Sequence, residues 1–269
     1  MNPKAPISAR LLFYVSLLFI GSCQKIHFED FIHPDNTLKQ CRIKQILEFN
    51  IFDSDTLFWN FKYNIWGDPI RITPSLNGTG QPEIFFRYDN QHRLTDYFGA
   101  YREELRAYEF WLHFDYLPNK FVLQKGYTLG PIINGNPVPS LQLPSIAYLQ
   151  FDMLGRLVRD STNYPSIFTP ILIQTYTYNS TGNLAHFKSV NQLTGSTDQE
   201  IYYTNYDNKV NISRTNRIWM FINRNYSVNN WTPAESYNQY GLPLKWRGTQ
   251  GNRFIYRNID DADIKYECR

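Results

Sequence analysis

Few residues in this 269-residue sequence combine the types and spacing that chemistry requires. His113 and Asp115 stand two positions apart in an expected strand, so their side chains share a face and could begin a metal or acid–base site. The sequence offers no third ligand beside them, and we interpret them as a solvated pair. The carboxylate runs at 53–55 and 260–263 could bind calcium, but neither has calcium-loop spacing, and turn chemistry explains both. These residues therefore predict no metal site.

Common catalytic patterns are missing from the sequence. It contains no Gly-x-Ser-x-Gly, no His-Glu-x-x-His, no phosphate-binding glycine-rich loop and no Cys-x-x-Cys. An enzyme whose residues meet only in space would escape this test, and a hydrolase of envelope polymers, with paired carboxylates in a groove, is the enzymatic alternative. We predict a protein that is not an enzyme, with no catalytic residue and no cofactor.

Aromatic side chains are the remaining candidates for function, because their rings can hold sugars by stacking and apolar contact. Aromatic residues make up 17% of the sequence and include six Trp. Trp66 lies inside an expected turn, and Trp231 lies in the run Asn-Asn-Trp-Thr-Pro, so we expect both to be exposed. We take Trp66 and Trp231 as candidate ligand-stacking residues and the other four as packing residues.

The amino terminus has the layout of a signal peptide. Two positive charges, Lys4 and Arg10, precede an apolar run at 11–20. The run is too short to span a bilayer comfortably as a helix, and it leads into Ile-Gly-Ser-Cys23. Those four residues resemble the lipobox of bacterial lipoproteins, and the resemblance implies cleavage before Cys23 and a lipid on its sulfur. An ordinary secretory signal and a eukaryotic secreted protein are the alternatives.

A lipid on Cys23 divides the chain into a signal peptide at 1–22, a tether at 23–40 and a single domain at 41–269. The membrane would then be a partner through the lipid anchor, since no later apolar run is long enough to span it. Gln24 resembles the sorting position of lipoproteins sent to the outer membrane, which implies a cell-envelope location and leaves open whether the domain faces the periplasm or the outside. The net charge of +3, with no basic block, predicts no nucleic-acid partner.

Two further cysteines lie at opposite ends of the expected domain. Cys41 begins the first plausible strand, and Cys268 ends the last. In an oxidising compartment they could form a disulfide, which would require the first and last strands to be neighbours. Two buried, unpaired thiols are the alternative, and the sequence leaves both open.

One turn unit recurs along the chain, and the expected strands are arranged around it. The unit is an aromatic residue, Asp or Asn, two spacers, Gly and an apolar residue, and Phe151-Asp-Met-Leu-Gly is its clearest copy. Asp or Asn at the first turn position and Gly at the fourth suit a type I turn. Exact and looser copies begin at Tyr63, Tyr88, Phe114, Phe151, Tyr178, Tyr206 and Tyr237. Their steps of 25, 26, 37, 27, 28 and 31 residues fit a hairpin plus its return connection.

The strands that enter these turns alternate with a period of two, which predicts one apolar face and one mixed, wet face. The expected inward residues are Trp59, Phe61, Tyr63, Ile84, Phe86, Tyr88, Phe110, Leu112, Phe114, Ala147, Leu149, Phe151, Tyr176, Tyr178, Tyr202, Thr204 and Tyr206. The pattern predicts an all-β fold, an antiparallel meander of about seven hairpins. Since open sheets seldom exceed about ten strands, we expect this sheet to curl into a barrel-like or rolled form.

Two stretches interrupt the rhythm. Seven Gly and Pro residues fall between positions 126 and 144, which predicts a surface loop, with a domain boundary as the alternative. The stretch 100–108 has a helical spacing of apolar residues, but the hairpin rhythm needs a returning strand, so we expect a strand from about Arg106.

The corners at Tyr88-Asp89, Phe151-Asp152 and Tyr206-Asp207, together with the Ser22-Cys23 signal, resemble those of YD-repeat proteins. The match is to the short, RHS-like version found in uncharacterised lipoproteins of the Bacteroidota. This resemblance implies a β-rich domain outside the cytoplasm and no known reaction. We therefore predict a lipid-anchored, non-enzymatic binding or scaffold module for an unidentified protein or glycan partner, with a glycan-binding lipoprotein as the alternative.

Overall fold

The computed structural model describes residues 41–49, 56–76, 80–101, 106–142, 144–164, 171–248, 252–255 and 257–269. The signal peptide 1–22, the tether 23–40, the lipidation site Cys23 and the carboxylates at 53–55 lie outside the described residues. Within these residues no helix is both long and apolar enough to cross a bilayer.

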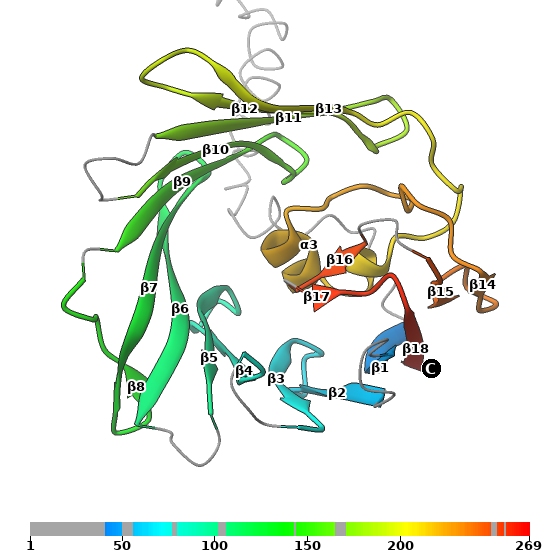
Figure 1. Cartoon of the computed structure of the whole chain (residues 1–269), viewed down its shortest axis with the longest axis horizontal. Coiled ribbons are helices and arrows are strands. Elements are labelled where there is room, and N and C mark those ends of the chain that lie inside the picture. The colour runs from blue at the N-terminus through cyan, green and yellow to red at the C-terminus, as the bar shows by residue number, and fades with distance from the viewer. Residues whose placement is uncertain are drawn as a thin grey trace, which may run out of the picture.

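A single antiparallel sheet of sixteen strands dominates the fold and curls into an open C (Figure 1). Its order is β13-β12-β11-β10-β9-β7-β6-β5-β4-β3-β2-β1-β18-β15-β14, with β8 paired to β7, so the sheet is not closed. The predicted antiparallel meander is therefore confirmed, and the curl is open between β13 and β14. The strands are β1 Cys41–Phe49, β2 Thr56–Tyr63, β3 Pro69–Pro74, β4 Glu83–Tyr88, β5 Leu94–Ala100, β6 Ala107–Leu117, β7 Phe121–Ile133, β8 Asn136–Pro137, β9 Ser145–Phe151, β10 Leu157–Asn163, β11 Leu172–Tyr178, β12 Leu184–Asn191, β13 Thr197–Tyr202, β14 Ser236–Tyr237, β15 Pro243–Lys245 and β18 Ala262–Cys268.

Side-chain acceptors build the corners. Asp152 Oδ1 accepts hydrogen bonds from the backbone N–H groups of Leu154 and Arg156, both at 2.9 Å, and Gly155 takes a φ of +71°. Four other corners are built in the same way, with the side chain accepting from the N–H groups two and four residues after it in its own turn. The accepting residues are Asn64, Asp89, Asn179 and Asn238. Because one carboxylate or amide oxygen satisfies two turn donors, Asp or Asn recurs at this position.

Tyrosine recurs in the unit for a second reason, which is that its hydroxyl group links consecutive hairpins. Tyr88 donates to the carbonyl of Pro69 at 2.6 Å, and Tyr178 donates to that of Leu157 at 2.9 Å; each acceptor begins the return strand of the preceding hairpin. The same link joins Tyr116 to Leu94, Tyr206 to Leu184 and Tyr266 to Pro243. Burial raises the pKa of Tyr178 well above its usual value, so its hydroxyl stays protonated and can donate.

Five of the seven expected corners join adjacent strands, and two do not. Phe114 and Asp115 lie within β6, which continues to Leu117, and the chain turns at 118–120 instead. Tyr116 makes the tyrosine hydroxyl link there, so this copy of the unit begins at Tyr116, two residues later than the sequence analysis placed it. Tyr206 and Asp207 do not form a hairpin, because the chain turns from β13 into the interior of the curl.

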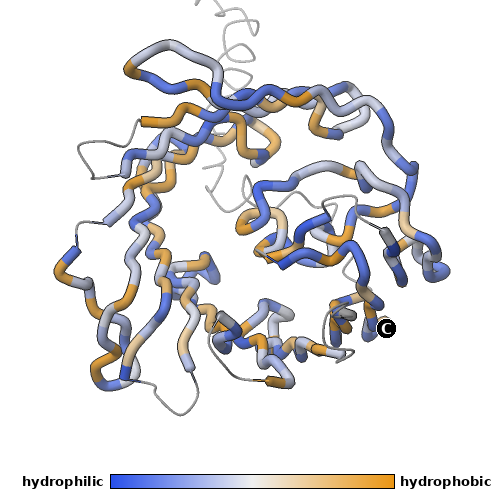
Figure 2. The backbone as a smooth tube through the Cα atoms, in the orientation of Figure 1, coloured by the Kyte–Doolittle hydropathy of each residue, from blue (hydrophilic) through white to orange (hydrophobic). Residues whose placement is uncertain are grey.

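The segment 203–235, which we call the inner segment, fills the inside of the C together with the short hairpin of β16 (Arg253–Phe254) and β17 (Arg257–Asn258) (Figure 1). It contains a 3-10 helix, η2 (Ile212–Thr215), and a helix, α3 (Arg217–Asn223), that Asn216 caps by accepting the Ile218 N–H at 2.9 Å. Trp219 in α3 is fully buried against the rings of Phe61 and Phe86 on the sheet, with centroids at 5.7 and 5.6 Å. The curled sheet therefore closes its apolar face around this segment, in which α3 carries hydrophobic residues (Figure 2).

Polar contacts hold α3 at both ends. At its start, Asn216 donates to the Gly67 carbonyl at 2.9 Å, and Arg217 lies 3.2 Å from Asp68 in the β2–β3 turn. At its end, Arg224 donates to Gln124 Oε1 on β7 at 2.6 Å and lies 3.5 Å from Asp160 on β10. These contacts tie the inner segment to both sides of the C.

The first half of the stretch 126–144 is not the surface loop that its Gly and Pro content predicted. Strand β7 runs through it to Ile133, and β8 folds back to pair with that end. Gly130 leaves room for the Tyr108 ring and Gly126 leaves room for Ser145, because a Cβ on either would collide with its neighbour. Here glycine permits close approach in a strand instead of marking a turn.

The face expected to be wet is apolar on one part of the sheet. Phe98, Tyr108 and Trp111 form a second buried cluster there, with Phe85 stacked on Phe98 at 5.1 Å. At the other end, Tyr202 was expected to face inward and is instead 68% exposed. It is the register partner of His186, on whose ring it stacks at 4.4 Å, while its neighbour Ile201 pairs with the core-packed Phe187. The strand expected from about Arg106 is confirmed, since β6 begins at Ala107.

Candidate ligand-binding cavity

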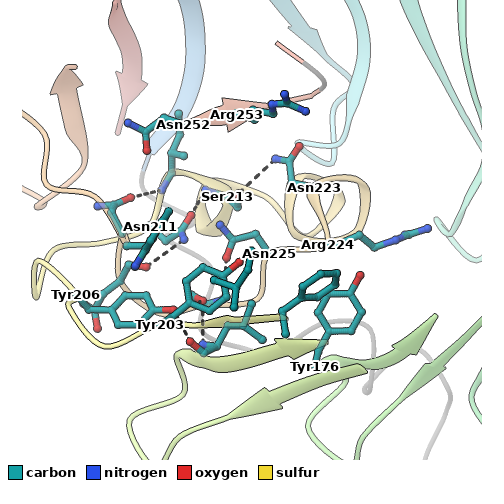
Figure 3. Close-up of a pocket in the computed structure, with 18 of the residues that line it drawn as sticks. Tyr176, Tyr203, Tyr206, Asn211, Ser213, Asn223, Arg224, Asn225, Asn252 and Arg253 are labelled. Carbon is teal, nitrogen blue, oxygen red and sulfur yellow. Dashed lines mark hydrogen bonds between the residues drawn. The ribbon is translucent and has the colours of Figure 1, made fainter. Parts of the chain in front are cut away.

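A cavity of about 460 Å³ lies between strands β11–β13 and the inner segment (Figure 3). The Tyr176 side chain comes from β11 on the sheet side of this space, Tyr203 begins the inner segment directly after β13, and Asn252 and Arg253 come from the opposite side, at β16. The volume lies within the usual range for small-molecule sites.

Amide and aromatic side chains make up most of the walls. The amides are Gln199, Asn211, Asn223, Asn225, Asn229, Asn230 and Asn252, and the rings are Tyr176, Phe187, Tyr203, Tyr206, Trp231 and Trp246. Arg224 and Arg253 add positive charge, while no Asp, Glu, His, Lys or Cys is found among the described lining residues. Such walls offer hydrogen bonds and apolar faces without an acid–base pair.

Several of these amides form a fixed frame. Asn211 Oδ1 accepts the Ser213 N–H at 2.8 Å, which caps η2, and its Nδ2 donates to the Asn229 carbonyl at 3.1 Å. Asn230 donates through Nδ2 to Asp207 at 2.9 Å and to the Val210 carbonyl at 3.1 Å. Because these bonds lock the side chains, the cavity wall is largely preorganised.

Two buried donors on the walls have no hydrogen-bond partner among the described residues. They are Nδ2 of Asn252 and the indole Nε1 of Trp246, a residue that is only 3% exposed. Buried donors without a partner are costly, so a bound acceptor or water would stabilise both. No pattern in the sequence pointed to either group.

Trp231 and Tyr203 form the aromatic corner of the cavity. Their ring centroids are 5.0 Å apart, with planes at 83°, and Trp231 keeps 45% of its surface exposed. Burial raises the pKa of Tyr203, so this hydroxyl is neutral at physiological pH. Two perpendicular rings of this kind present one exposed face and one edge to a ligand.

The structure separates the two Trp residues that the sequence analysis singled out. Trp231 lines the cavity, whereas Trp66 is 66% exposed at the β2–β3 turn, where its ring lies 4.5 Å from that of His92. Only Trp231 therefore lies beside a concave site.

The His113 and Asp115 pair belongs to a larger polar cluster away from the cavity. His113 Nδ1 lies 2.8 Å from Asp96 and its Nε2 lies 3.3 Å from Asp115, which also pairs with Lys125 at 2.8 Å. The hydrogen bond with the Asp96 carboxylate raises the pKa of His113. No group of three or more His, Cys, Asp or Glu residues that could hold a metal occurs in the described ranges.

The remaining candidate residues stabilise the fold or the cavity wall. Cys41 and Cys268 are register partners of β1 and β18 and form a disulfide bond. Asp260, from the carboxylate run at 260–263, accepts the Asn252 N–H at 2.7 Å and so supports the cavity wall.

Sequence reasoning missed the asparagines, although the sequence carries a signal for them. Eight Asn fall between positions 205 and 230, and five of them, Asn211, Asn223, Asn225, Asn229 and Asn230, line the cavity. No protein-family model and no curated protein matches the chain, so these comparisons assign it to no family.

Proposed function

We propose that this chain is a lipid-anchored envelope protein whose curled sheet is a non-catalytic binding module, with a saccharide as the ligand of the cavity. One observation carries the proposal: an exposed Trp231–Tyr203 corner opens onto walls of preorganised amides. Sugars combine an apolar ring face with many hydroxyl groups, and a pair of rings beside amide donors and acceptors matches both.

The cavity favours binding over the two competing roles. A pure scaffold has no need of a concave site with buried, unpartnered donors such as Asn252 Nδ2. A glycoside hydrolase needs two carboxyl groups facing each other across its substrate, whereas the described cavity walls carry amides, hydroxyls, rings, aliphatic side chains and guanidinium groups but no carboxyl group.

Calorimetric titration with a panel of oligosaccharides from bacterial envelopes and host surfaces tests the ligand. We expect one class to bind, and Trp231→Ala or Tyr203→Ala to weaken it by about tenfold, which corresponds to about 1.4 kcal/mol. Trp66→Ala is the matched control, since it removes an exposed Trp outside the cavity. Equal affinity in the Trp231 and Trp66 variants would refute the assignment of the site.

The anchor rests on the sequence around Cys23, and the envelope location follows from it. We propose the outer membrane on the basis of Gln24. Incorporation of labelled palmitate should be lost in Cys23→Ala, and the protein should then leave the membrane fraction. Unchanged membrane partition in that variant would count against the lipid anchor.

A further inference from the structure

All the Asp and Asn corners of the meander lie at one end of the sheet, because each closes a hairpin in the same sense. We call this end the corner rim; it consists of the turns at 64–68, 89–93, 118–120, 152–156, 179–183 and 238–242. In the corners at 64–68, 89–93, 152–156 and 179–183, the two residues that follow Asp or Asn are exposed, and we call them the protruding positions.

Large apolar residues occupy both protruding positions in two of these turns. Ile65 is 89% exposed and Trp66 is 66% exposed, while Met153 is 70% and Leu154 is 63% exposed. Turn chemistry does not require apolar residues here, since the corner uses only backbone N–H groups of these residues. The equivalent positions of the turn at 179–183 are Ser180 and Thr181. Adjacent exposed apolar side chains of this kind indicate a contact surface.

Each apolar turn contacts one of the two turns that lie between them in the sheet. Trp66 lies 4.5 Å from His92 in the next turn, and Met153 Sδ lies 2.8 Å from Lys120 Nζ in the turn at 118–120. Leu117, which precedes that turn, is also exposed. The rim therefore carries two apolar tips, at 65–66 and 153–154, with polar residues and a lysine between them.

The chain enters the domain at this same rim. The β1–β2 register places Gln45 opposite Asn60, so four residues further along, Cys41 is level with Asn64 at the first corner. Residues 24–40 separate this point from Cys23. A lipid on Cys23 would therefore be connected to the domain at the corner rim and not at the opposite end of the sheet.

We propose that the corner rim rests on the bilayer surface, with Ile65, Trp66, Met153 and Leu154 inserted among the lipid headgroups. The inference rests on the lipid anchor of the proposed function. It goes beyond that anchor by fixing the orientation of the domain. Trp and Met beside a lysine suit the boundary between headgroups and acyl chains, where an aromatic ring and a cation are both accommodated.

Fluorescence quenching tests this contact on the lipidated, full mature protein reconstituted in phosphatidylcholine vesicles with brominated acyl chains. Four of the six Trp are buried, so Trp66 and Trp231 are the exposed reporters. We expect brominated lipid to quench part of the Trp emission in the native protein and in Trp231→Phe, and this quenched part to disappear in Trp66→Phe. Quenching that survives Trp66→Phe, or no quenching at all, would overturn the proposal.

A second comparison tests the rim without relying on Trp. A nitroxide attached at Met153→Cys should be shielded from a water-soluble relaxation agent when the vesicles are present. The same label at Leu193→Cys is the matched control, because Leu193 is 76% exposed in the turn at the opposite end of the sheet. Equal accessibility at the two sites would contradict the proposed orientation.

Palmitate labelling of the same samples separates failure of the rim from failure of the anchor. Protein that takes up label while Trp66 stays unquenched refutes the rim contact and keeps the anchor. Protein that takes up no label but shows Trp66 quenching supports the rim contact and removes the anchor.

Discussion

The Asp or Asn corner occurs both in the meander from β2 to β12 and in the inner segment. It closes a hairpin only in the meander. In the meander, Asp152 satisfies two backbone N–H groups and pairs with Arg156, all within its own turn. In the inner segment, Asp207 accepts from Lys209 N–H nearby, but also from Asn230 and from the Tyr237 hydroxyl, which are more than twenty residues away.

This difference shows what a local motif can and cannot specify. The corner fixes the direction of the chain over about five residues, and its partners then decide whether the following segment pairs as a strand. After Asp152 the partner is the preceding strand β9, whereas after Asp207 the partners are the asparagines of the inner segment. The cavity exists because the second outcome places amides opposite the open end of the sheet.

The largest expected effect comes from removing the residue that packs the inner segment against the meander. Trp219→Ala should lower the free energy of unfolding by about 3–5 kcal/mol, since it removes a fully buried ring in contact with Phe61 and Phe86. Chemical denaturation followed by circular dichroism measures this. Trp66→Ala is the control and should change the free energy by less than about 0.5 kcal/mol, because Trp66 is exposed. Similar losses in both would show that the inner segment does not pack as described.

The two corner aspartates provide the direct test of the comparison. Asp207→Ala should cost about 2–3 kcal/mol, because it leaves Asn230 and Tyr237 without their acceptor. Asp152→Ala should cost about 1 kcal/mol, since water can replace the lost acceptor at an exposed turn. Urea denaturation of the two variants would reveal the order, and a larger loss for Asp152→Ala would reverse our reading of the two regions.

Tyr237 offers a spectroscopic check on the same contact. Burial and the hydrogen bond to Asp207 raise the pKa of Tyr237 to about 12. In Asp207→Ala this pKa should fall toward its ordinary value, and ultraviolet titration of tyrosinate with Tyr237→Phe as a reference would detect the change. An unchanged titration would show that Asp207 does not contact the hydroxyl.

The hydroxyl links within the meander should each contribute less. Tyr178→Phe should cost about 1 kcal/mol, because it leaves the Leu157 carbonyl without its donor and creates little space. Tyr148→Phe is the matched control, as Tyr148 is half exposed on the outer face. Thermal unfolding of the pair would measure the difference, and equal midpoints would mean that the link adds no stability.

The smallest expected effect concerns the outer face and depends on pH. Since the folded-state pKa of His113 is raised, its contacts with Asp96 and Asp115 contribute most below the ordinary pKa of 6.5, and this contribution is lost as pH rises through the folded value. The difference in melting temperature between the native protein and His113→Gln should therefore be larger at pH 5.5 than at pH 8.5. A difference independent of pH would exclude this role.

The sequence by itself determined the meander, because its signals act over short distances. A period of two and an Asp or Asn before Gly specify a strand and a turn within about ten residues, and five of the seven expected corners fold accordingly. The same signals were insufficient where neighbouring strands decide the residue type. From the sequence, Gly126 and Gly130 predicted a loop. In the structure they lie in β7, where a side chain at these positions would collide with Ser145 and Tyr108.

Only the tertiary structure decided where the cavity lies. Its walls come from Tyr176 on β11, the asparagines of the inner segment and Asn252 beyond β15, which no spacing rule connects. Their meeting depends on the curl of the sheet and on the burial of Trp219 inside it, and both arise from packing the whole apolar face out of water. That energy is summed over the entire sheet, so no single stretch of sequence contains it.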